Sequence, residues 1–324
     1  MATDPQNFYL NVLLRSVLGL LSIAGNGLVV FVILRNKSLL KDGFNVLLLQ
    51  LALGDFFIGF GNGLRVLEAL LSHFNLLVVT PLNCFLIELP LLIGMNLSQL
   101  IMFLIAVDRF ISIRQLKGIK LINNKIFSWV RAGLCTSFAV LVSLGALIEL
   151  DTTIRRSDLG STVTPVVKTC HVTMGWSDAY LGYFSAMTTF FSFTIVGAYA
   201  LTFVSYWLHK KKVSASLIHR EQRIAQTLIL IVLAYLFCWC LPRLITSIHH
   251  WLQTENAVSK TITGSIGYLG VLNSVLNVAI YGCKHRQIRI GMVAFLGLAS
   301  SKYVTDNRIF TTVSSTKNNR VSIC

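Results

Sequence analysis

The sequence predicts an all-α integral membrane protein, a bundle of seven transmembrane helices followed by a short amphipathic helix. Three observations lead to this fold class. Only 13% of the 324 residues are charged, about half of the roughly 25% that is usual in soluble domains. The mean hydropathy is high, at +0.70. Seven apolar windows each reach the roughly 20 residues that a helix needs to cross a bilayer.

The windows follow one another with short connections. None of the windows shows the alternation of apolar and polar residues that is typical of a membrane β-strand. The segment before the first window contains Asp4 and no basic residue, and the apolar run that follows is longer than the core of a signal peptide. We therefore expect the first window to be a retained span. The stretch 284–298 mixes basic and apolar residues and predicts an amphipathic helix along the membrane surface. The seven windows are 10–34, 44–71, 82–113, 126–149, 178–208, 224–250 and 263–283.

Charge predicts the orientation. Nineteen of the 28 Lys and Arg residues lie in segments 35–43, 110–128, 209–223 and 282–324, whereas the other side carries only Arg155, Arg156, Lys168 and Lys260. The positive-inside rule makes the four basic segments cytoplasmic. We therefore expect an extracellular N-terminus (1–9), a seven-span domain (10–300) and a cytoplasmic tail (301–324). The net charge of +15 is thereby explained without nucleic acid as a partner.

Several polar residues lie inside the windows. Ionisable groups at membrane depth are costly and are functional candidates by default. The second window contains Asp55 and the third ends in Asp108-Arg109. Amides and hydroxyls that could satisfy a buried carboxylate include Asn26 in the first window, and Asn273, Ser274 and Asn277 in the seventh. Each of these residues taken alone could equally be a helix–helix contact.

Their joint spacing resembles that of the rhodopsin-like (class A) G-protein-coupled receptors over all seven windows. Cys84 and Ser98 lie at the family's distances before Arg109, and Asn273 lies four residues before Asn277. Short loops and divergent details most resemble the nematode serpentine chemoreceptors of class SX. The motifs that carry the resemblance are Gly25-Asn26, Leu51 to Asp55, Asp108-Arg109-Phe110 and Asn277-Val278-Ala279-Ile280-Tyr281.

The resemblance implies a plasma-membrane receptor that transmits the binding of a chemosensory, peptide or small-molecule ligand to a heterotrimeric G protein, surrounded by membrane lipid. It implies three groups of residues. Coupling is assigned to Asp108, Arg109, Tyr206 and Tyr281. A sodium pocket centred on Asp55 includes Ser98, Asn273 and Asn277, with a protonated Asp55 in a water-mediated network as the alternative. The ligand pocket comprises Arg65, Glu88, Leu91, Met95, Trp239 and Arg243.

Cysteine positions add a further expectation. Cys84 and Cys170 are the only cysteines on the predicted outer side. The exterior is oxidising, so we expect a disulfide between them. No cofactor other than a sodium ion is expected. The sequence lacks phosphate-loop, HExxH and nucleophile-elbow motifs, so no enzymatic activity is expected.

The chain departs from the family pattern at several positions. Phe110 stands for the motif tyrosine, and Val278 stands for the proline that usually kinks the seventh helix. Trp239 lies one place early relative to Pro242, which leaves open whether it faces the pocket floor or a neighbouring helix. Leu91 occupies the family's amine-anchoring position and disfavours an amine ligand. Val271 occupies the retinal-lysine position of opsins and disfavours a photoreceptor.

Other interpretations stay open at this stage. In the outer half, Arg65 could pair with Glu68, and Glu88 with Arg243, without any ligand role. The chain could instead be a transporter or channel, although no internal repeat with broken helices is visible. It could also be a non-signalling heptahelical protein, against which only Arg109 and the basic segments argue.

Overall fold

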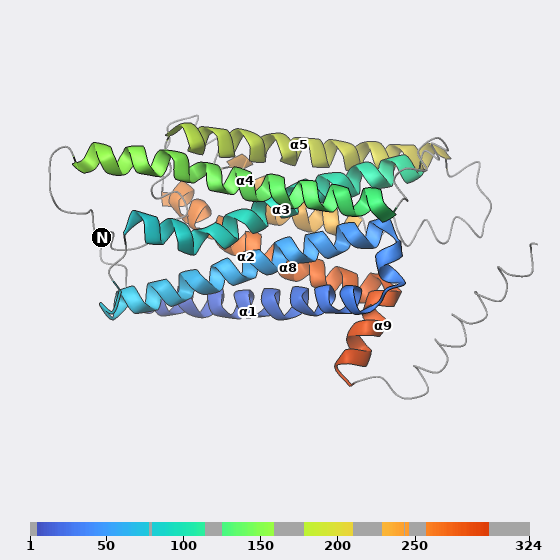
Figure 1. Cartoon of the computed structure of the whole chain (residues 1–324), viewed down its shortest axis with the longest axis horizontal. Coiled ribbons are helices and arrows are strands. Elements are labelled where there is room, and N and C mark those ends of the chain that lie inside the picture. The colour runs from blue at the N-terminus through green and yellow to red at the C-terminus, as the bar shows by residue number, and fades with distance from the viewer. Residues whose placement is uncertain are drawn as a thin grey trace, which may run out of the picture.

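The computed structural model describes residues 5–77, 80–113, 125–158, 178–209, 229–242, 244–245 and 257–297. Within these residues the protein is helical and has no strand. The long helices lie side by side along the longest axis of the molecule (Figure 1). The predicted all-α membrane bundle is therefore confirmed.

Helices α1 to α5 and α8 cover their predicted windows and extend them at one or both ends, whereas only residues 229–242 and 244–245 of the sixth window, 224–250, are described. The helices described, in chain order, are α1 (Pro5–Arg35), the 3-10 turn η1 (Leu39–Lys41), α2 (Gly43–His73), α3 (Pro81–Ile113), α4 (Lys125–Asp158), α5 (Asp178–His209), the π-helical turn η4 (Leu236–Cys240), α8 (Ala257–Lys284) and α9 (Arg286–Phe295). The stretches of α1 to α5 are long and apolar enough to cross a membrane, and shorter apolar helices run over Ile229–Cys240 and Gly267–Cys283.

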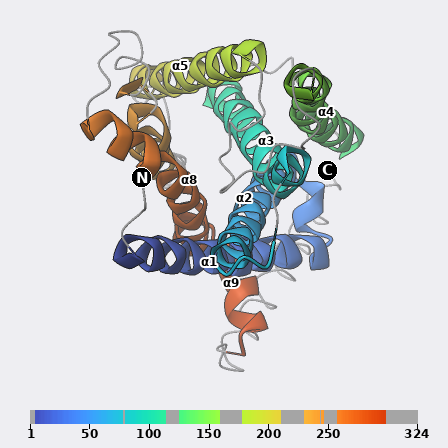
Figure 2. The same ribbon diagram turned by 90° about the vertical axis from the view of Figure 1, so that its left-hand side faces the viewer.

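Helix α2 lies at the centre of the packing. It contacts α1, α3, α4 and α8, as the end-on view shows (Figure 2). Its inward positions, such as Leu47 and Leu51, are fully buried together with Leu92 and Ile101 of α3. The outer faces of the peripheral helices carry exposed leucine and phenylalanine instead, which is the distribution expected where lipid is the solvent.

The backbones of α2 and α3 approach closely at glycine positions. A Cβ added at Gly94 would lie 2.6 Å from the carbonyl oxygen of Gly54 and 2.7 Å from the amide nitrogen of Ile58. Only a residue without a side chain fits at Gly94, because both neighbours are backbone atoms. Small residues of this kind bring membrane helices into close contact, so α2 and α3 form one tightly joined pair.

Helix α8 continues as a single helix through Val278, where the family proline is replaced. Val278 packs on Gly25 of α1, where an added Cβ would lie 2.9 Å from the Val278 Cγ1. The Gly-Asn motif of the first window therefore makes room for the residue that replaces the proline. A proline would have lacked the backbone N–H at this point in the helix.

The predicted amphipathic helix is α9, which runs crosswise to the bundle beyond the end of α8 (Figure 1). His285 caps its start, and the side chain accepts a hydrogen bond from the Ile288 N–H. Ile288 is fully buried, and Phe295 lies with its ring 4.9 Å from that of Phe31 in α1. These contacts hold one face of α9 against the bundle. Below, the end of the bundle at which α9 lies is called the α9 end.

Candidate functional site

Asp55 is the centre of a buried polar network in the middle of the bundle. Its side chain is fully buried. Ser98 of α3 donates a hydrogen bond to Asp55 Oδ1 across 2.9 Å, and Asn277 of α8 donates one to Oδ2 across 2.8 Å. Three helices therefore converge on one carboxylate, as the motif spacing predicts.

The network continues toward α1 through hydroxyl and amide groups. The Ser22 hydroxyl donates to the Asp55 backbone carbonyl across 2.9 Å and lies 2.7 Å from the Ser274 hydroxyl. Asn26 donates to the carbonyl of Ser22 and to that of Ser274. The four residues of this network, Ser22, Asn26, Asp55 and Ser274, are each 0% exposed. The hydrogen bonds that join α1, α2 and α8 are therefore shielded from solvent.

Three amide oxygens in or beside this network have no hydrogen-bond partner among the described residues. They are Asn26 Oδ1, Asn273 Oδ1 and Asn277 Oδ1, and all three side chains are buried. An unpartnered buried acceptor is costly, and a cation would satisfy it. Hard cations prefer oxygen ligands, which this set supplies as carboxylate, hydroxyl and amide. The residues present thus fit a sodium ion.

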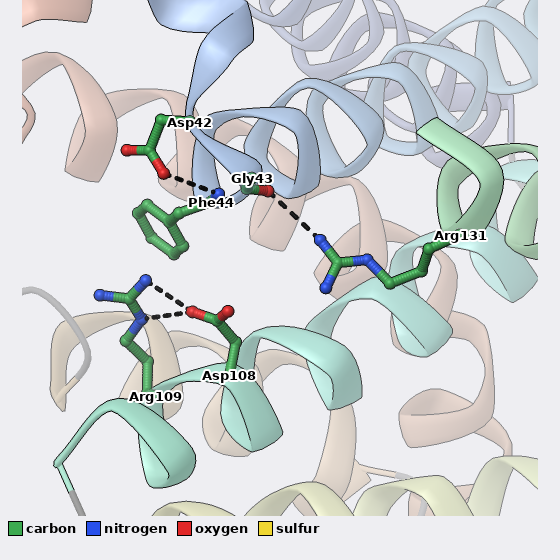
Figure 3. Close-up of polar contacts among 6 residues, drawn as sticks. All are labelled: Asp42, Gly43, Phe44, Asp108, Arg109 and Arg131. Atoms are coloured by element: carbon green, nitrogen blue, oxygen red, sulfur yellow. Dashed lines mark hydrogen bonds and ion pairs between the residues drawn. The ribbon is translucent and has the colours of Figure 1, made fainter. Parts of the chain in front are cut away.

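At the α9 end, Arg109 is held by a neighbour in sequence and a neighbour in space. Its Nη2 lies 2.6 Å and its Nε 3.1 Å from Asp108 Oδ2. Its guanidinium carbon lies 3.8 Å above the centre of the Phe44 ring, at the start of α2. Figure 3 shows the ion pair and the ring on different sides of the guanidinium. Arg109 thus forms an ion pair with its neighbour in sequence, Asp108.

The first turn of α2 is itself fixed by polar contacts (Figure 3). Asp42 accepts a hydrogen bond from the Phe44 N–H across 3.1 Å, which caps the helix. Arg131 of α4 donates to the Gly43 carbonyl across 3.3 Å and interacts electrostatically with Asp108. The same arginine therefore links α4 to the start of α2 and to the charge pair on α3.

Two tyrosines lie buried between the Asp55 network and Arg109. Tyr281 of α8 is 1% exposed and Tyr199 of α5 is 6% exposed. Neither hydroxyl has a hydrogen-bond partner within the described part of the chain. Tyr206 belongs to α5, but its side chain lies outside the described residues. Tyr199, two helical turns earlier, is an α5 tyrosine whose side chain is described and lies in the core.

At the opposite end, Arg65 of α2 pairs with Glu88 of α3. Arg65 Nε lies 2.7 Å from Glu88 Oε1, and the two side chains are only 11% and 2% exposed. The expected pairing of Arg65 with Glu68 is only part of the arrangement, in which Arg65 forms an ion pair with Glu88 and also interacts electrostatically with Glu68. Where two helices pack closely, a residue across the interface can be as near as a residue one turn away on the same helix. Here Glu88, across the interface between α2 and α3, forms the ion pair with Arg65. Arg243 lies outside the described residues.

Further groups adjoin this pair. The Arg15 guanidinium of α1 lies 4.8 Å from the centre of the Tyr268 ring in α8, and Asn62 donates to the Arg15 carbonyl across 2.8 Å. Leu91 and Met95, expected in the ligand pocket, are buried in the core of the bundle. An added Cβ at Gly61 of α2 would lie 2.5 Å from the Leu91 N atom, so this part of α3 presses against α2.

Trp239 lies in the π-helical turn η4. A π-turn accommodates one more residue than an α-helical turn, which is the displacement that the sequence shows between Trp239 and Pro242. Trp239 is 5% exposed. Its ring packs on Gly270 of α8, where an added Cβ would lie 2.9 Å from Trp239 Cζ3. Of the two orientations left open, Trp239 takes the one toward a neighbouring helix.

The cysteines divide into two groups. Cys84 is fully buried at the start of α3 and is disulfide-bonded. Its expected partner, Cys170, lies outside the described residues, so the pairing stays a prediction. Cys135, Cys238, Cys240 and Cys283 are free thiols.

Sequence reasoning missed Phe44, Arg131, Ser22 and Tyr199. Tyr199 carries a usable signal, because it lies seven residues before Tyr206 and therefore on the same face of α5. Arg131 is a lone cation near the start of the fourth window and could have been flagged as costly in a membrane. Phe44 and Ser22 carry no such signal, since single aromatic and hydroxyl residues are common in membrane helices.

The helical bundle, the polar network on Asp55 and the Asp108–Arg109 pair define a heptahelical membrane receptor. A family model described as 7 transmembrane receptor (rhodopsin family) matches residues 25–281, and the chain belongs to that family. It is therefore a multi-pass membrane protein and a G-protein-coupled receptor, and the transporter interpretation has no support.

Three similar proteins are adenosine A3 receptors of mammals. The chain is 26% identical to that of Ovis aries over 291 residues, which cover 84% of this chain and 85% of the relative. It is 24% identical to the receptors of Bos taurus and Canis lupus familiaris, with 84% of this chain covered and 85% and 86% of the relatives, respectively.

Proposed function

We propose that this receptor sits in the plasma membrane with its N-terminus outside, and that it activates a heterotrimeric G protein at the α9 end through Arg109. The observation that carries the proposal is the buried charge pair of Asp108 and Arg109, in which the guanidinium is only 14% exposed. A cation stored at the end of a packed bundle can be exposed by a change of side-chain rotamer. The placement of the basic segments supports a cytoplasmic α9 end.

We propose roles for the remaining groups on the same basis. Asp55, Ser98, Asn273 and Asn277 would hold a sodium ion, which supplies positive charge to the buried carboxylate. Asp108, Tyr206 and Tyr281 would act with Arg109 in coupling. Arg65, Glu88, Leu91, Met95, Trp239 and Arg243 would lie at or below the ligand pocket, with the Arg65–Glu88 pair providing its charge.

The ligand is proposed to be a chemosensory, small-molecule or peptide agonist. The divergence at Phe110, Val278 and Trp239 supports the placement near the nematode serpentine chemoreceptors of class SX. The A3 relatives support a second candidate, because these proteins are named as receptors for adenosine. Adenosine therefore belongs in any first set of test compounds.

The proposal is tested by expressing the full chain in cells with a promiscuous Gα subunit and screening adenosine, water-soluble odorants and peptides. We expect at least one compound to raise intracellular calcium in wild-type cells and not in cells that express Arg109→Ala. A compound that binds at the surface and evokes equal calcium signals in both cell lines would show that coupling does not depend on Arg109.

A further inference from the structure

We infer that Phe44, in the first turn of α2, is a positioning residue that holds Arg109 in its resting orientation. This inference rests on the coupling role proposed for Arg109. The guanidinium carbon lies 3.8 Å from the centre of the Phe44 ring, well inside the roughly 6 Å within which a cation is attracted to a ring face. The contact joins residues 65 positions apart, one on α2 and one on α3.

The ring and the carboxylate occupy different parts of the guanidinium. Asp108 takes the edge of the guanidinium that carries Nε and Nη2, whereas Phe44 lies on another side, with the guanidinium carbon over the face of its ring (Figure 3). Arg131 also interacts electrostatically with Asp108, so this carboxylate serves two cations. The aromatic ring gives Arg109, in its observed rotamer, a second contact besides the ion pair with Asp108.

Phe44 can restrain Arg109 because its own backbone is fixed. Asp42 caps the turn by accepting from the Phe44 N–H, and Arg131 binds the Gly43 carbonyl. Asn45 donates to the Leu39 carbonyl across 3.2 Å, and Leu39 is 1% exposed. The backbone on both sides of Phe44 is therefore tied to η1 and α4, and it does not shift with Arg109.

On this inference, release of Arg109 is a side-chain movement. Close approach at Gly54 and Gly94 joins the α2 and α3 backbones, and Ser98 adds a hydrogen bond to Asp55. A slide of α3 past α2 would drive backbone atoms together. Arg109 therefore leaves the ring by changing rotamer, and the attraction of the ring adds directly to the barrier between the resting and released states.

The test measures ligand-independent nucleotide exchange on a purified G-protein heterotrimer by the full chain in lipid nanodiscs. Phe44→Leu removes the ring and keeps an apolar side chain. We expect a rise in the basal exchange rate of about two- to thirtyfold, the range that corresponds to the strength of cation–π contacts. Phe44→Tyr keeps the ring and should restore the low rate. Phe60→Leu, on the same helix but 42% exposed on its outer face, is the matched control and should exchange at the wild-type rate.

Asp108→Asn separates the possible failures. If Asp108→Asn raises the basal rate and Phe44→Leu does not, the inference is overturned while the coupling role of Arg109 stands. If neither variant exceeds the background of Arg109→Ala, the coupling role fails and the inference fails with it. A raised rate in Phe44→Tyr equal to that of Phe44→Leu also overturns it, because the ring would then be irrelevant. Phe44→Met, a second ring-free variant, is read in the same way if the leucine variant is not recovered folded.

Discussion

Asn277 of α8 donates a hydrogen bond of 2.8 Å to the carboxylate of Asp55 in α2, joining residues 222 positions apart. Ser98 of α3 binds the other carboxylate oxygen. One buried acid thus connects three helices. Burial of a lone carboxylate is costly. The polar groups around Asp55 therefore decide whether a cation binds there.

The first prediction concerns that ion. Sodium chloride should raise the melting temperature of the wild-type receptor in nanodiscs above its value in choline chloride of equal ionic strength. A bound ion at about a hundred times its Kd adds about 2.7 kcal/mol to the free energy of unfolding. Asp55→Asn should remove the difference between the two salts. Asn62→Ala, which removes an amide that binds the Arg15 carbonyl instead, should preserve it. A sodium effect that survives in Asp55→Asn would exclude this carboxylate as the ligand.

A second prediction separates coupling from ligand binding. Arg109→Ala should reduce agonist-evoked G-protein activation to background and leave agonist affinity nearly unchanged. The reason is distance, since Leu91 and Arg109 are 18 residues apart on α3, or about 27 Å at a rise of ~1.5 Å per residue. Radioligand binding and nucleotide exchange on the same nanodisc preparation measure the two effects. If Arg109→Ala lowered agonist affinity as much as it lowered activation, ligand binding and G-protein coupling would not be separable.

The Arg65–Glu88 pair should be sensitive to the loss of one partner. Glu88→Gln removes the ion-pair partner of the buried Arg65 guanidinium and leaves Glu68 as the remaining nearby acid, and it should lower the free energy of unfolding by about 3–5 kcal/mol. The double variant Arg65→Met/Glu88→Leu should recover much of this loss, because no uncompensated charge remains. Equilibrium unfolding in SDS measures both. If the double variant were as unstable as the single one, packing and not charge would explain the effect.

Glycine substitutions should distinguish close contact from open space. Gly94→Ala forces a methyl group against the Gly54 carbonyl and should cost about 1–3 kcal/mol of unfolding free energy. Gly133→Ala in α4 meets no atom within 4 Å and should stabilise the helix by up to about 1 kcal/mol. The same SDS titration compares them. Similar effects of both substitutions would contradict the close approach of α2 and α3.

The cap of α9 should depend on pH. Burial lowers the pKa of His285 below its ordinary value of 6.5, with Arg109 acting in the same direction and Asp42 opposing it. A lowered pKa means that the undocked form binds a proton more readily than the docked form. Docking of α9 is thus fully stable above pH 6.5 and weakens as the pH falls below it. Protonation also removes the Nδ1 lone pair that accepts from the Ile288 N–H.

Hydrogen exchange of the amides in residues 286–291 checks this prediction. After correction for intrinsic rates, protection should be lower at about pH 5.5 than at about pH 7.5, on either side of the ordinary histidine value. His285→Asn supplies a cap that does not titrate in this range, and should give equal protection at both values. Equal protection in the wild-type protein would mean that His285 does not control the cap.

Much of the architecture could be predicted from composition and spacing. The length of each apolar stretch predicts a membrane span. The reason is that a backbone in hydrocarbon has no water to bind, so its polar groups must form the internal hydrogen bonds of a helix. The convergence of Ser98 and Asn277 on Asp55 was implied by the resemblance to the class A receptors, in which polar residues with this spacing share one pocket. The amphipathic segment 284–298 likewise predicted α9, because basic and apolar residues separate onto two faces.

Tertiary structure alone decided which neighbours meet across helix interfaces. The sequence allowed Arg65 to pair with Glu68 one turn away, but the close approach of α2 and α3 brings Glu88 to it. It left the direction of Trp239 open, and a π-turn directs the ring toward Gly270 of α8. It contained no indication that Phe44 lies on Arg109. Periodicity specifies which face of a helix a residue occupies, whereas rotation and separation of two helices depend on how their small and large side chains fit together.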